Sequence, residues 1–327
     1  MLRLEDFRRF VPDQTIAQIY SRARRLYGKH IFHLNATYQG GGVAEILYSL
    51  VLLMNDVGID TGWRILHGSQ EFFEVTKSFH NALQGKKIAL TDRKKQIYLD
   101  INEMFSRFTH VDHDCVIIHD PQPLAFIRSY HKRQPWIWRC HIDLTDPDSE
   151  LWDFLKTFVL KYDQMIVSSD KYLKPDLPVP QRVMFPAINP LNAKNRDMDE
   201  KEVRQEIERA GNREPLVNAI QRFSSVIIQK SLREGFCLCV TEAMWKEAAV
   251  VASNIGGIPV QIEDGHNGFL LEPTDTDGFA ERIVHLLKNP DHARQLGKQA
   301  KETVRERFLI TRLLNDYLDL LNTVVDH

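Results

Sequence analysis

One stretch decides the fold, Ser231-Leu-Arg-Glu-Gly-Phe-Cys-Leu-Cys-Val-Thr-Glu242. It follows an apolar, β-branched run at residues 226–228 and leads into a helical pattern at residues 240–246. A strand, a tight loop and a helix start place backbone N–H groups where they can converge on an anion or another polar ligand. Glu234 in the loop and Glu242 near the helix start could then face one pocket at the carboxyl edge of a sheet, where open α/β folds bind their ligands.

Two glutamates eight positions apart also fit an exposed turn with solvated side chains. The pair alone does not distinguish such a turn from a ligand-binding loop. The residues that follow favour a binding loop. Gly256-Gly257 comes first, and Asp264-Gly265-His266-Asn267-Gly268-Phe269-Leu270 comes shortly after it. Glycines there let the backbone turn sharply and approach a ligand closely.

Length and composition exclude several classes of function. A chain of 327 residues exceeds one average core, so two domains are expected. With 43% hydrophobic and 26% charged residues it is typical of a soluble globular protein, and a net charge of -2 gives no support to nucleic-acid binding. The four cysteines lack metal-site spacing. Without an apolar run of about 18 residues or a signal-peptide core, no membrane association is expected and the cytoplasm is the expected compartment.

A strand at residues 31–34 runs into a glycine-rich segment, Asn35-Ala-Thr-Tyr-Gln-Gly-Gly-Gly-Val43, which opens a helix to about residue 55. Three successive glycines, Gly40, Gly41 and Gly42, would let the backbone come close to a ligand because no Cβ intervenes. The segment lacks the spacing of a dinucleotide-binding fingerprint. A tight packing turn is the other interpretation.

Histidine and aspartate follow two further apolar strands. Residues 115–118 lead into His119-Asp120-Pro121, and residues 136–138 lead into Arg139-Cys140-His141-Ile142-Asp143. A single histidine at a strand end is more often a local hydrogen-bonding residue than a catalyst. Two such pairs beside a glycine loop favour a functional site at the carboxyl edge of the sheet.

The domain organisation is expected to be residues 1–188 and residues 189–327, joined through a connection at residues 187–211. The second half shows strands only at residues 226–228, 249–252 and 269–271. Three strands are few for its helices, since doubly wound domains usually carry about five or six. The terminal helix at residues 311–325 is expected to pack back on the first domain.

The run from Glu234 to Leu270 resembles the carboxyl-terminal signature of retaining glycosyltransferases of family GT4. Further motifs resemble the trehalose glycosyltransferring synthases of that family. These are Tyr38-x-Gly-Gly-Gly-Val-Ala-Glu45, His119-Asp-Pro-Gln-Pro123, Trp138-Arg-Cys-His-Ile-Asp143, Val179-Pro-Gln-Arg-Val-Met-Phe-Pro-Ala187, Leu232-Arg-Glu-Gly-Phe236 and Thr241-Glu-Ala-Met-Trp245. The resemblance covers nearly the whole chain. It implies an α/β fold of the GT-B type, with two Rossmann-like domains facing a cleft.

The resemblance also implies residue roles. Glu234, His141 and Asp120 would be the catalytic set, with Glu234 on the donor glucose hydroxyls and the His141 backbone carbonyl near the anomeric centre. Glu242 would hold the donor ribose, and the acceptor side would use His119, Asp120, Arg139 and Asp143. The remaining donor contacts would come from the backbone of Gly235, Phe236, Cys237 and Leu238 and from the Gly40, Gly41 and Gly42 loop. No metal and no other cofactor is implied, and the partners are nucleotide-glucose and glucose.

One segment departs from the family pattern. In the family, the first strand of the second domain ends in a loop that carries an arginine and, a few residues later, a lysine, both of which grip the diphosphate. Here Ile207-Glu-Arg-Ala-Gly-Asn-Arg-Glu-Pro-Leu-Val217 passes directly from the connecting helix to a helix that should come much later. The second domain is therefore expected to be truncated by roughly two or three βα units. The strand at residues 226–228 is expected at a sheet edge, where a homodimer could form.

The first functional hypothesis is a retaining glucosyltransferase that makes trehalose from ADP- or UDP-glucose and free glucose. A catalytically weak or inactive sugar-binding homologue is the second, because the segment with the arginine and lysine is absent. A trehalose phosphorylase is the third. Glucose-dependent nucleotide release separates the first hypothesis from the second, and glucose 1-phosphate formation from trehalose and phosphate indicates the third.

Overall fold

The computed structural model describes residues 2–38, 41–209 and 213–325 and divides into two compact units. Unit 1 comprises Met1–Phe185 and Leu313–His327, and unit 2 comprises Pro186–Arg312. The chain therefore leaves unit 1 once and re-enters it through its last helix, α11 (Ile310–Val324).

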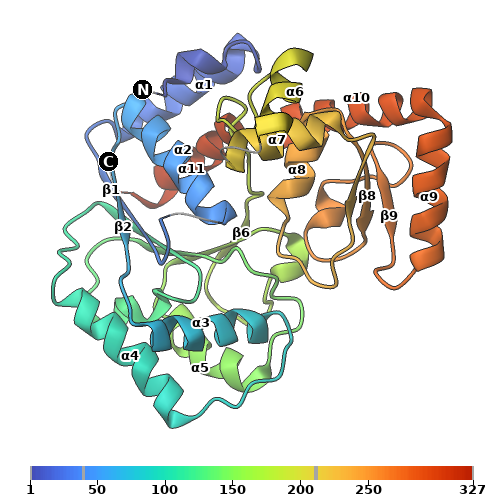
Figure 1. The fold of residues 1–327 in the computed structure, drawn as a ribbon. Helices are drawn as coiled ribbons and strands as arrows, with labels where there is room; N and C mark the ends of the chain where they lie inside the picture. Colours follow the sequence, from blue (N-terminus) through green and yellow to red (C-terminus); the bar gives the residue numbers. More distant parts are fainter. Residues whose placement is uncertain (1, 39–40, 210–212, 326–327) are drawn as a thin grey trace. The chain divides into compact units, whose positions relative to one another are not determined.

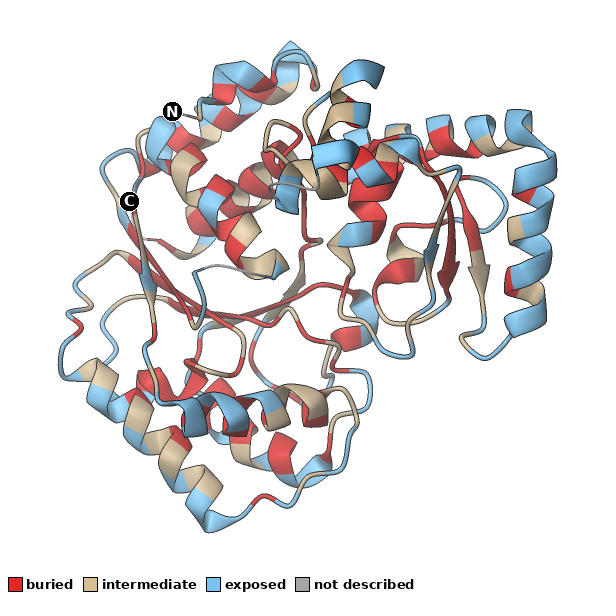
Figure 2. Cartoon of the chain, in the orientation of Figure 1, coloured by how far each residue is buried: buried red, intermediate tan, exposed pale blue. Residues whose placement is uncertain are grey.

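Unit 1 is built on a parallel sheet of six strands in its described part, in the order β2-β1-β3-β4-β5-β6. The strands are β1 (His30–Asn35), β2 (Asp60–Ile65), β3 (Cys115–His119), β4 (Trp136–Arg139), β5 (Gln164–Val167) and β6 (Gln181–Val183). Every residue of β3 and β4 is buried, as expected for parallel strands covered on both faces. Figure 2 shows the central strands as an almost continuous buried layer.

Helices cover both faces of this sheet. Figure 1 shows α3, α4 and α5 on one face and α1, α2 and α11 on the other. Their bounds are α1 (Asp13–Ala23), α2 (Gly42–Asp56), α3 (Gln70–Leu83), α4 (Asp92–Ser106) and α5 (Ser149–Val159), with short 3-10 turns η1 (Leu4–Phe7), η2 (Arg24–Leu26), η3 (Leu124–Ser129) and η4 (Asp170–Tyr172). The side chains of Ser69, Thr91 and Asp148 cap α3, α4 and α5 by accepting from backbone N–H groups in the first turn.

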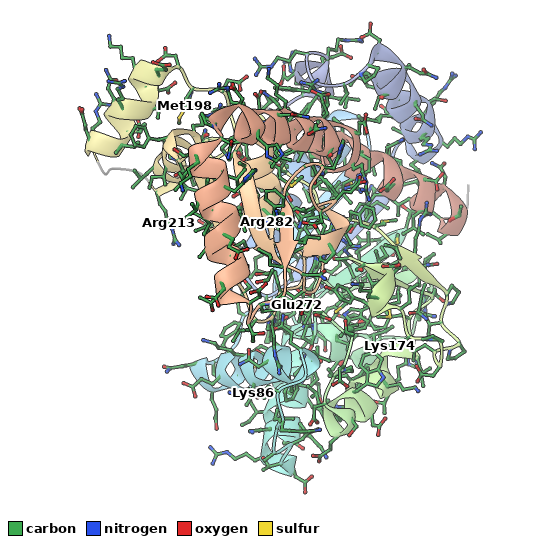
Figure 3. All side chains as sticks on the ribbon, turned by 90° about the vertical axis from the view of Figure 1, so that its right-hand side faces the viewer. Lys86, Lys174, Met198, Arg213, Glu272 and Arg282 are labelled. Atoms are coloured by element: carbon green, nitrogen blue, oxygen red, sulfur yellow. The ribbon has the colours of Figure 1, made fainter. Side chains whose placement is uncertain are left out.

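Unit 2 contains a smaller parallel sheet of three strands among its described residues, in the order β7-β8-β9. They are β7 (Val226–Gln229), β8 (Ala249–Ser253) and β9 (Phe269–Leu271), accompanied by α6 (Glu200–Arg209), α7 (Arg213–Phe223), α8 (Leu238–Trp245), η5 (Ile258–Val260), α9 (Thr276–Lys288) and α10 (Pro290–Arg307). The predictions of three strands and of an edge position for residues 226–228 are confirmed. Figure 3 shows Arg282 on α9, whose guanidinium carbon lies 4.6 Å from the centre of the Phe269 ring.

The two passages of the chain at the base of unit 2 are hydrogen-bonded to each other. The Ile188 N–H donates to the Phe308 carbonyl at 2.8 Å, and the Ile310 N–H donates to the Ile188 carbonyl at 2.9 Å. The Arg312 guanidinium adds a bond to the Pro186 carbonyl at 3.1 Å. Unit 2 is thus an insertion whose first and last residues lie side by side.

No helix in the described ranges is long and apolar enough to cross a membrane.

Candidate active site

The predicted site residues fall into two groups, one in each unit. In unit 1, β3 ends at His119 and is followed by Asp120, while β4 ends at Arg139 and is followed after one residue by His141. Because β3 and β4 are parallel neighbours, with His119 opposite Arg139, both ends lie at the same edge of the sheet. The structure therefore brings Asp120 and His141 together, as the sequence pattern predicts.

Asp120 adopts a left-handed backbone conformation, with φ of 64°, which is uncommon for a residue with a side chain. Three hydrogen bonds hold it there. Its N–H donates to the Arg139 carbonyl at 2.9 Å, its carbonyl accepts from the Trp138 indole at 3.0 Å, and its carboxylate accepts from the His141 N–H at 2.8 Å. Burial raises the pKa of Asp120 to about 6, opposed by the hydrogen bond from His141 and by the nearby Arg139 charge.

A row of three imidazoles leads to the same edge. His33 Nδ1 lies 3.0 Å from His119 Nε2, and His119 Nδ1 lies 3.1 Å from His141 Nε2. Burial lowers the pKa of all three, to about 3 for His33 and well below the usual value for the other two, so the rings are neutral near neutral pH. Sequence reasoning missed His33. The available signal was a polar residue inside the apolar run at residues 31–34.

Arg139, a predicted acceptor-binding residue, is buried with only 1% of its surface exposed. Its guanidinium donates to the Met184 carbonyl at 2.7 Å and to the Val167 carbonyl at 3.2 Å. These bonds give Arg139 a structural role behind the site, and its contact with an acceptor stays a prediction. The Asp143 carboxylate accepts from the N–H and hydroxyl of Thr145, at 2.8 and 2.6 Å, which closes a local turn.

Of the predicted glycine loop, Gly40 lies outside the described residues. Gly41 has φ of 91° and precedes α2, which begins at Gly42. No described atom lies within 4 Å of the position that a Cβ at Gly41 would occupy. The requirement for glycine at this position is therefore the backbone angle rather than close packing.

In unit 2, the loop between β7 and α8 carries the predicted donor-binding residues Glu234, Gly235, Phe236, Cys237 and Leu238. Cys237 adopts a left-handed conformation directly before α8, with φ of 72°. Partial burial raises the pKa of Glu234, opposed by hydrogen bonds from the Cys237 side chain and the Gly235 N–H.

Two later residues clamp this loop. A Cβ at Gly257 would come within 2.5 Å of the Gly235 carbonyl oxygen and 2.9 Å of the Phe236 Cα, so the loop backbone packs directly against this glycine. The Gln261 amide donates to the Phe236 carbonyl, and its oxygen accepts from the Thr241 hydroxyl at 2.6 Å. The Gly256-Gly257 motif thus supports the loop by permitting close backbone contact.

Glu242 is buried on α8, with 1% exposure, and its Oε1 lies 3.3 Å from Lys194 Nζ. The Lys246 ammonium donates to Asn195 Oδ1 at 2.9 Å and to the Glu242 carbonyl at 3.1 Å, and burial lowers the pKa of Lys246. Sequence reasoning missed both lysines, because Lys194 is distant in sequence and Lys246 is one charge at a helix end. The Glu242 carboxylate therefore lies beside the ammonium group of Lys194.

Within the described part of the chain, no group of three or more His, Cys, Asp or Glu residues is arranged to hold a metal ion. All four cysteines are free thiols.

Comparisons with known families match both halves of the chain. The family described as "Trehalose synthase, N-terminal domain" matches residues 33–174, a range that contains His33, Asp120 and His141. The family described as "Glycosyl transferases group 1" matches residues 193–303, which contain Glu234 and Glu242.

Individual relatives extend these matches over nearly the full length. The chain is 40% identical to the trehalose synthase of Thermococcus litoralis over 401 aligned positions, which cover 98% of this chain and 97% of the relative. It is 33% identical to the trehalose synthase of Rubrobacter xylanophilus, covering 97% and 96%. A trehalose phosphorylase of Pleurotus pulmonarius is 22% identical and covers 93% of this chain but 58% of its own length.

Solved structures identify the fold. The trehalose-6-phosphate synthase OtsA superposes with a TM-score of 0.70 at 12% identity, covering 91% of this chain and all of that one. The Anabaena protein Alr3699/HepE, solved in complex with UDP-glucose, gives a TM-score of 0.69 at 12% identity, with 90% of this chain covered and all of that one. The chain belongs to the trehalose synthase family of glycosyltransferases and has the GT-B fold.

Proposed function

We propose that the protein transfers glucose from a nucleotide-activated glucose, ADP- or UDP-glucose, to free glucose and forms trehalose with retention of configuration. The observation that carries the proposal is the pairing of Asp120 with the His141 N–H at 2.8 Å, on strand ends within the range that matches trehalose synthases. In this proposal, the Asp120 carboxylate and the His141 imidazole, on neighbouring strand ends, both contact one bound hexose.

In the proposed reaction, the bond between the anomeric carbon and the diphosphate oxygen breaks, and a bond forms between that carbon and an acceptor hydroxyl oxygen. The acceptor proton passes to the leaving phosphate on the same face of the sugar. Ionised Asp120 would accept a hydrogen bond from the acceptor glucose. Glu234 and the N–H groups of residues 235–238 would hold the donor, with Glu242 on its ribose. No residue here acts as a metal ligand in this proposal.

A second candidate, a sugar-binding homologue with little turnover, is supported by the small sheet of unit 2. The alignment with the Thermococcus relative runs over 401 positions, although this chain has 327 residues, so the relative carries residues that this chain lacks. If these include the diphosphate-gripping arginine and lysine, the leaving group loses stabilisation. Removing a single such donor costs about 10²–10³-fold in rate in other enzymes.

The test measures the release of ADP from ADP-glucose and of UDP from UDP-glucose, each with and without glucose, and identifies the disaccharide by NMR. Release that depends on glucose and yields an α,α-linked product supports the synthase, and Asp120→Asn should abolish most of it. If calorimetry shows that the chain binds glucose but no nucleotide is released, the sugar-binding homologue is supported instead. Formation of glucose 1-phosphate from trehalose and phosphate would contradict both hypotheses and show that the protein is a phosphorylase.

We further propose that the substrates are the principal partners and that the chain forms a homodimer through the open edge of β7.

The proposed chemistry uses no metal. Addition of a chelator should therefore leave the transferase rate unchanged.

A further inference from the structure

The three imidazoles form a row that runs from the core of unit 1 to the edge of its sheet. His33 lies within β1 and is fully buried, His119 ends β3 with 1% exposure, and His141 follows β4 and is partly exposed. Because β1, β3 and β4 are consecutive neighbours, each ring contacts the next, with centroids 5.3 and 5.4 Å apart and nearly parallel planes. Of the three rings, His141 is the one that is not buried, so it is the ring that could touch a ligand at this edge.

Hydrogen bonding in this row allows two proton arrangements. A neutral imidazole has one N–H donor and one nitrogen acceptor, and the pKa of each ring is low enough to keep it neutral. If His33 Nδ1 donates to His119 Nε2, then His119 must donate from Nδ1 to His141 Nε2, and His141 carries its proton on Nδ1. If the first bond is reversed, all three protons lie on Nε2. The tautomer of His141 is therefore coupled to that of His33.

The buried end of the row favours the first arrangement. His33 Nε2 has no hydrogen-bond partner among the described residues and no exposed surface. In the first arrangement this atom is a lone pair, whereas in the second it is an N–H group without an acceptor. Buried N–H groups without an acceptor are rarer than under-satisfied acceptors. Free imidazole has a modest opposite preference for the proton on Nε2. The first arrangement is therefore favoured because the free-energy cost of a buried, unpaired N–H at His33 Nε2 exceeds this preference.

We propose that His33 is a positioning residue, which acts through His119 to hold His141 as the Nδ1–H tautomer, so that His141 donates a hydrogen bond to an oxygen of the bound substrate. His33 itself touches no substrate because it is fully buried. The inference rests on the proposed function only for the identity of that oxygen, since the tautomer is a property of the unliganded chain.

The first test is ¹⁵N NMR of the full chain labelled at histidine, without ligand. We expect His33, His119 and His141 to show a protonated Nδ1 and an unprotonated Nε2 that persist from about pH 6 to about pH 8, because none of the rings titrates there. Single substitutions assign these signals among the 13 histidines. Protons on Nε2, or rapid exchange between the two tautomers, would overturn the proposal whether or not the chain is active.

The second test reverses the donor at the buried end. His33→Met supplies a sulfur acceptor and no donor, so His119 should turn its proton to Nε2 and His141 should follow. His33→Asn keeps an amide N–H near the place of Nδ1 and should preserve the wild-type tautomers. For glucose-dependent transfer, we expect kcat to fall roughly five- to tenfold in His33→Met with KM little changed, and to stay within about twofold in His33→Asn.

His80→Leu is the matched control, because this partly buried histidine lies on α3 outside the row. Thermal denaturation of each variant separates a loss of fold from a loss of positioning. An unchanged His141 tautomer in folded His33→Met would contradict the coupling. An altered tautomer with wild-type kcat would contradict the positioning role. If wild-type chain releases no nucleotide, the proposed function fails while the NMR result still decides the tautomer.

Discussion

Asp120 concentrates several unusual properties in one residue. Its left-handed backbone costs of the order of 1–3 kcal/mol, and such a conformation persists only where the surroundings over-determine it. The bonds to Arg139, Trp138 and His141 supply that constraint. They aim a carboxylate of raised pKa at the edge of the sheet, and its state of ionisation therefore controls what the edge can bind.

The pH dependence of transfer should follow Asp120. With its pKa raised to about 6 by burial, the ionised form that accepts hydrogen bonds from an acceptor sugar is lost below about pH 6. We expect kcat/KM for glucose to fall roughly tenfold for each pH unit well below that value. Stopped assays from about pH 4.5 to about pH 8 measure the profile, and Asp120→Asn should be slow and lack this inflection. A profile that is flat through this range would show that Asp120 does not act as an ionised acceptor.

The raised pKa of Asp120 also determines how this residue changes the free energy of unfolding with pH. A carboxyl whose pKa is higher in the folded than in the unfolded chain makes the folded chain bind protons more tightly. Its contribution to the free energy of unfolding is therefore greatest below the ordinary value of 3.8 and is lost as the pH rises through about 6.

Glu242→Gln should weaken nucleotide binding without unfolding unit 2. The substitution removes the charge that pairs with Lys194 and that would hold the ribose hydroxyls. A charge-assisted hydrogen bond contributes roughly 1.5–3 kcal/mol, so the Kd for a nucleoside diphosphate should rise roughly ten- to hundredfold. Calorimetry measures this, with Glu281→Gln, an exposed residue of α9, as the control. An unchanged Kd would remove Glu242 from the donor site.

At the residue scale, sequence reasoning found side chains that follow buried strands and missed those inside them. His119, Asp120 and His141 come at strand ends, where an apolar run stops and polar chemistry begins. His33 lies within such a run, and its relation to His119 depends on the order of the strands. Lys194 meets Glu242 only after the chain has folded. The functional roles of all these residues stay predictions.

At the scale of elements, the central strands were predicted closely and the edge strands less well. Residues 115–118 and 136–138 were expected, and β3 and β4 each extend by one residue. At the edges, the sequence at residues 63–66 and 183–185 predicts strands, whereas β2 spans Asp60–Ile65 and β6 spans Gln181–Val183. Edge strands are only partly covered, so their apolar pattern is interrupted and their boundaries are poorly marked.

The open edge of β7 should make the protein self-associate. Ile228 on this strand is 49% exposed, and Phe223 and Leu232 on either side of it are 68% and 74% exposed. Unpaired strand edges with apolar side chains pair with other chains unless a charge blocks them. Ile228→Lys should therefore shift sedimentation towards monomer, whereas Val284→Lys, at an exposed apolar position of α9, should not. A wild-type chain that is monomeric at high concentration would contradict this.

At the scale of the whole molecule, the last helix stabilises unit 1. Asp319 on α11 pairs with Arg22 and Arg182, and Leu318 is fully buried. Leu318→Ala should lower the free energy of unfolding by about 2–5 kcal/mol, because a large side chain leaves a cavity. Leu287→Ala, at a position 56% exposed, serves as the control in denaturant titrations. Equal losses would show that α11 is not part of the core.

Activity should rise when the family's segment is restored between Gly211 and Arg213, a junction that touches residues outside the described ranges. We expect glucose-dependent nucleotide release to increase by at least about 10²-fold, because the segment supplies cations for the diphosphate. Lys230 is a poor substitute, since its ammonium donates to the Pro273 carbonyl at 2.7 Å. Equal rates with and without the segment would instead show that basic residues already present in the chain bind the donor diphosphate.

The insertion of unit 2 into unit 1 also fixes an order of events during protein synthesis. A ribosome adds residues from the amino end at about 5–20 per second, and domains fold as units once their residues have emerged. Unit 2, Pro186–Arg312, is complete before Leu313–His327 has been made, although unit 1 began first. Part of one face of the nascent six-stranded sheet, the part that α11 covers, therefore stays exposed until α11 has been made, and a chaperone that shields apolar surface would act during that interval.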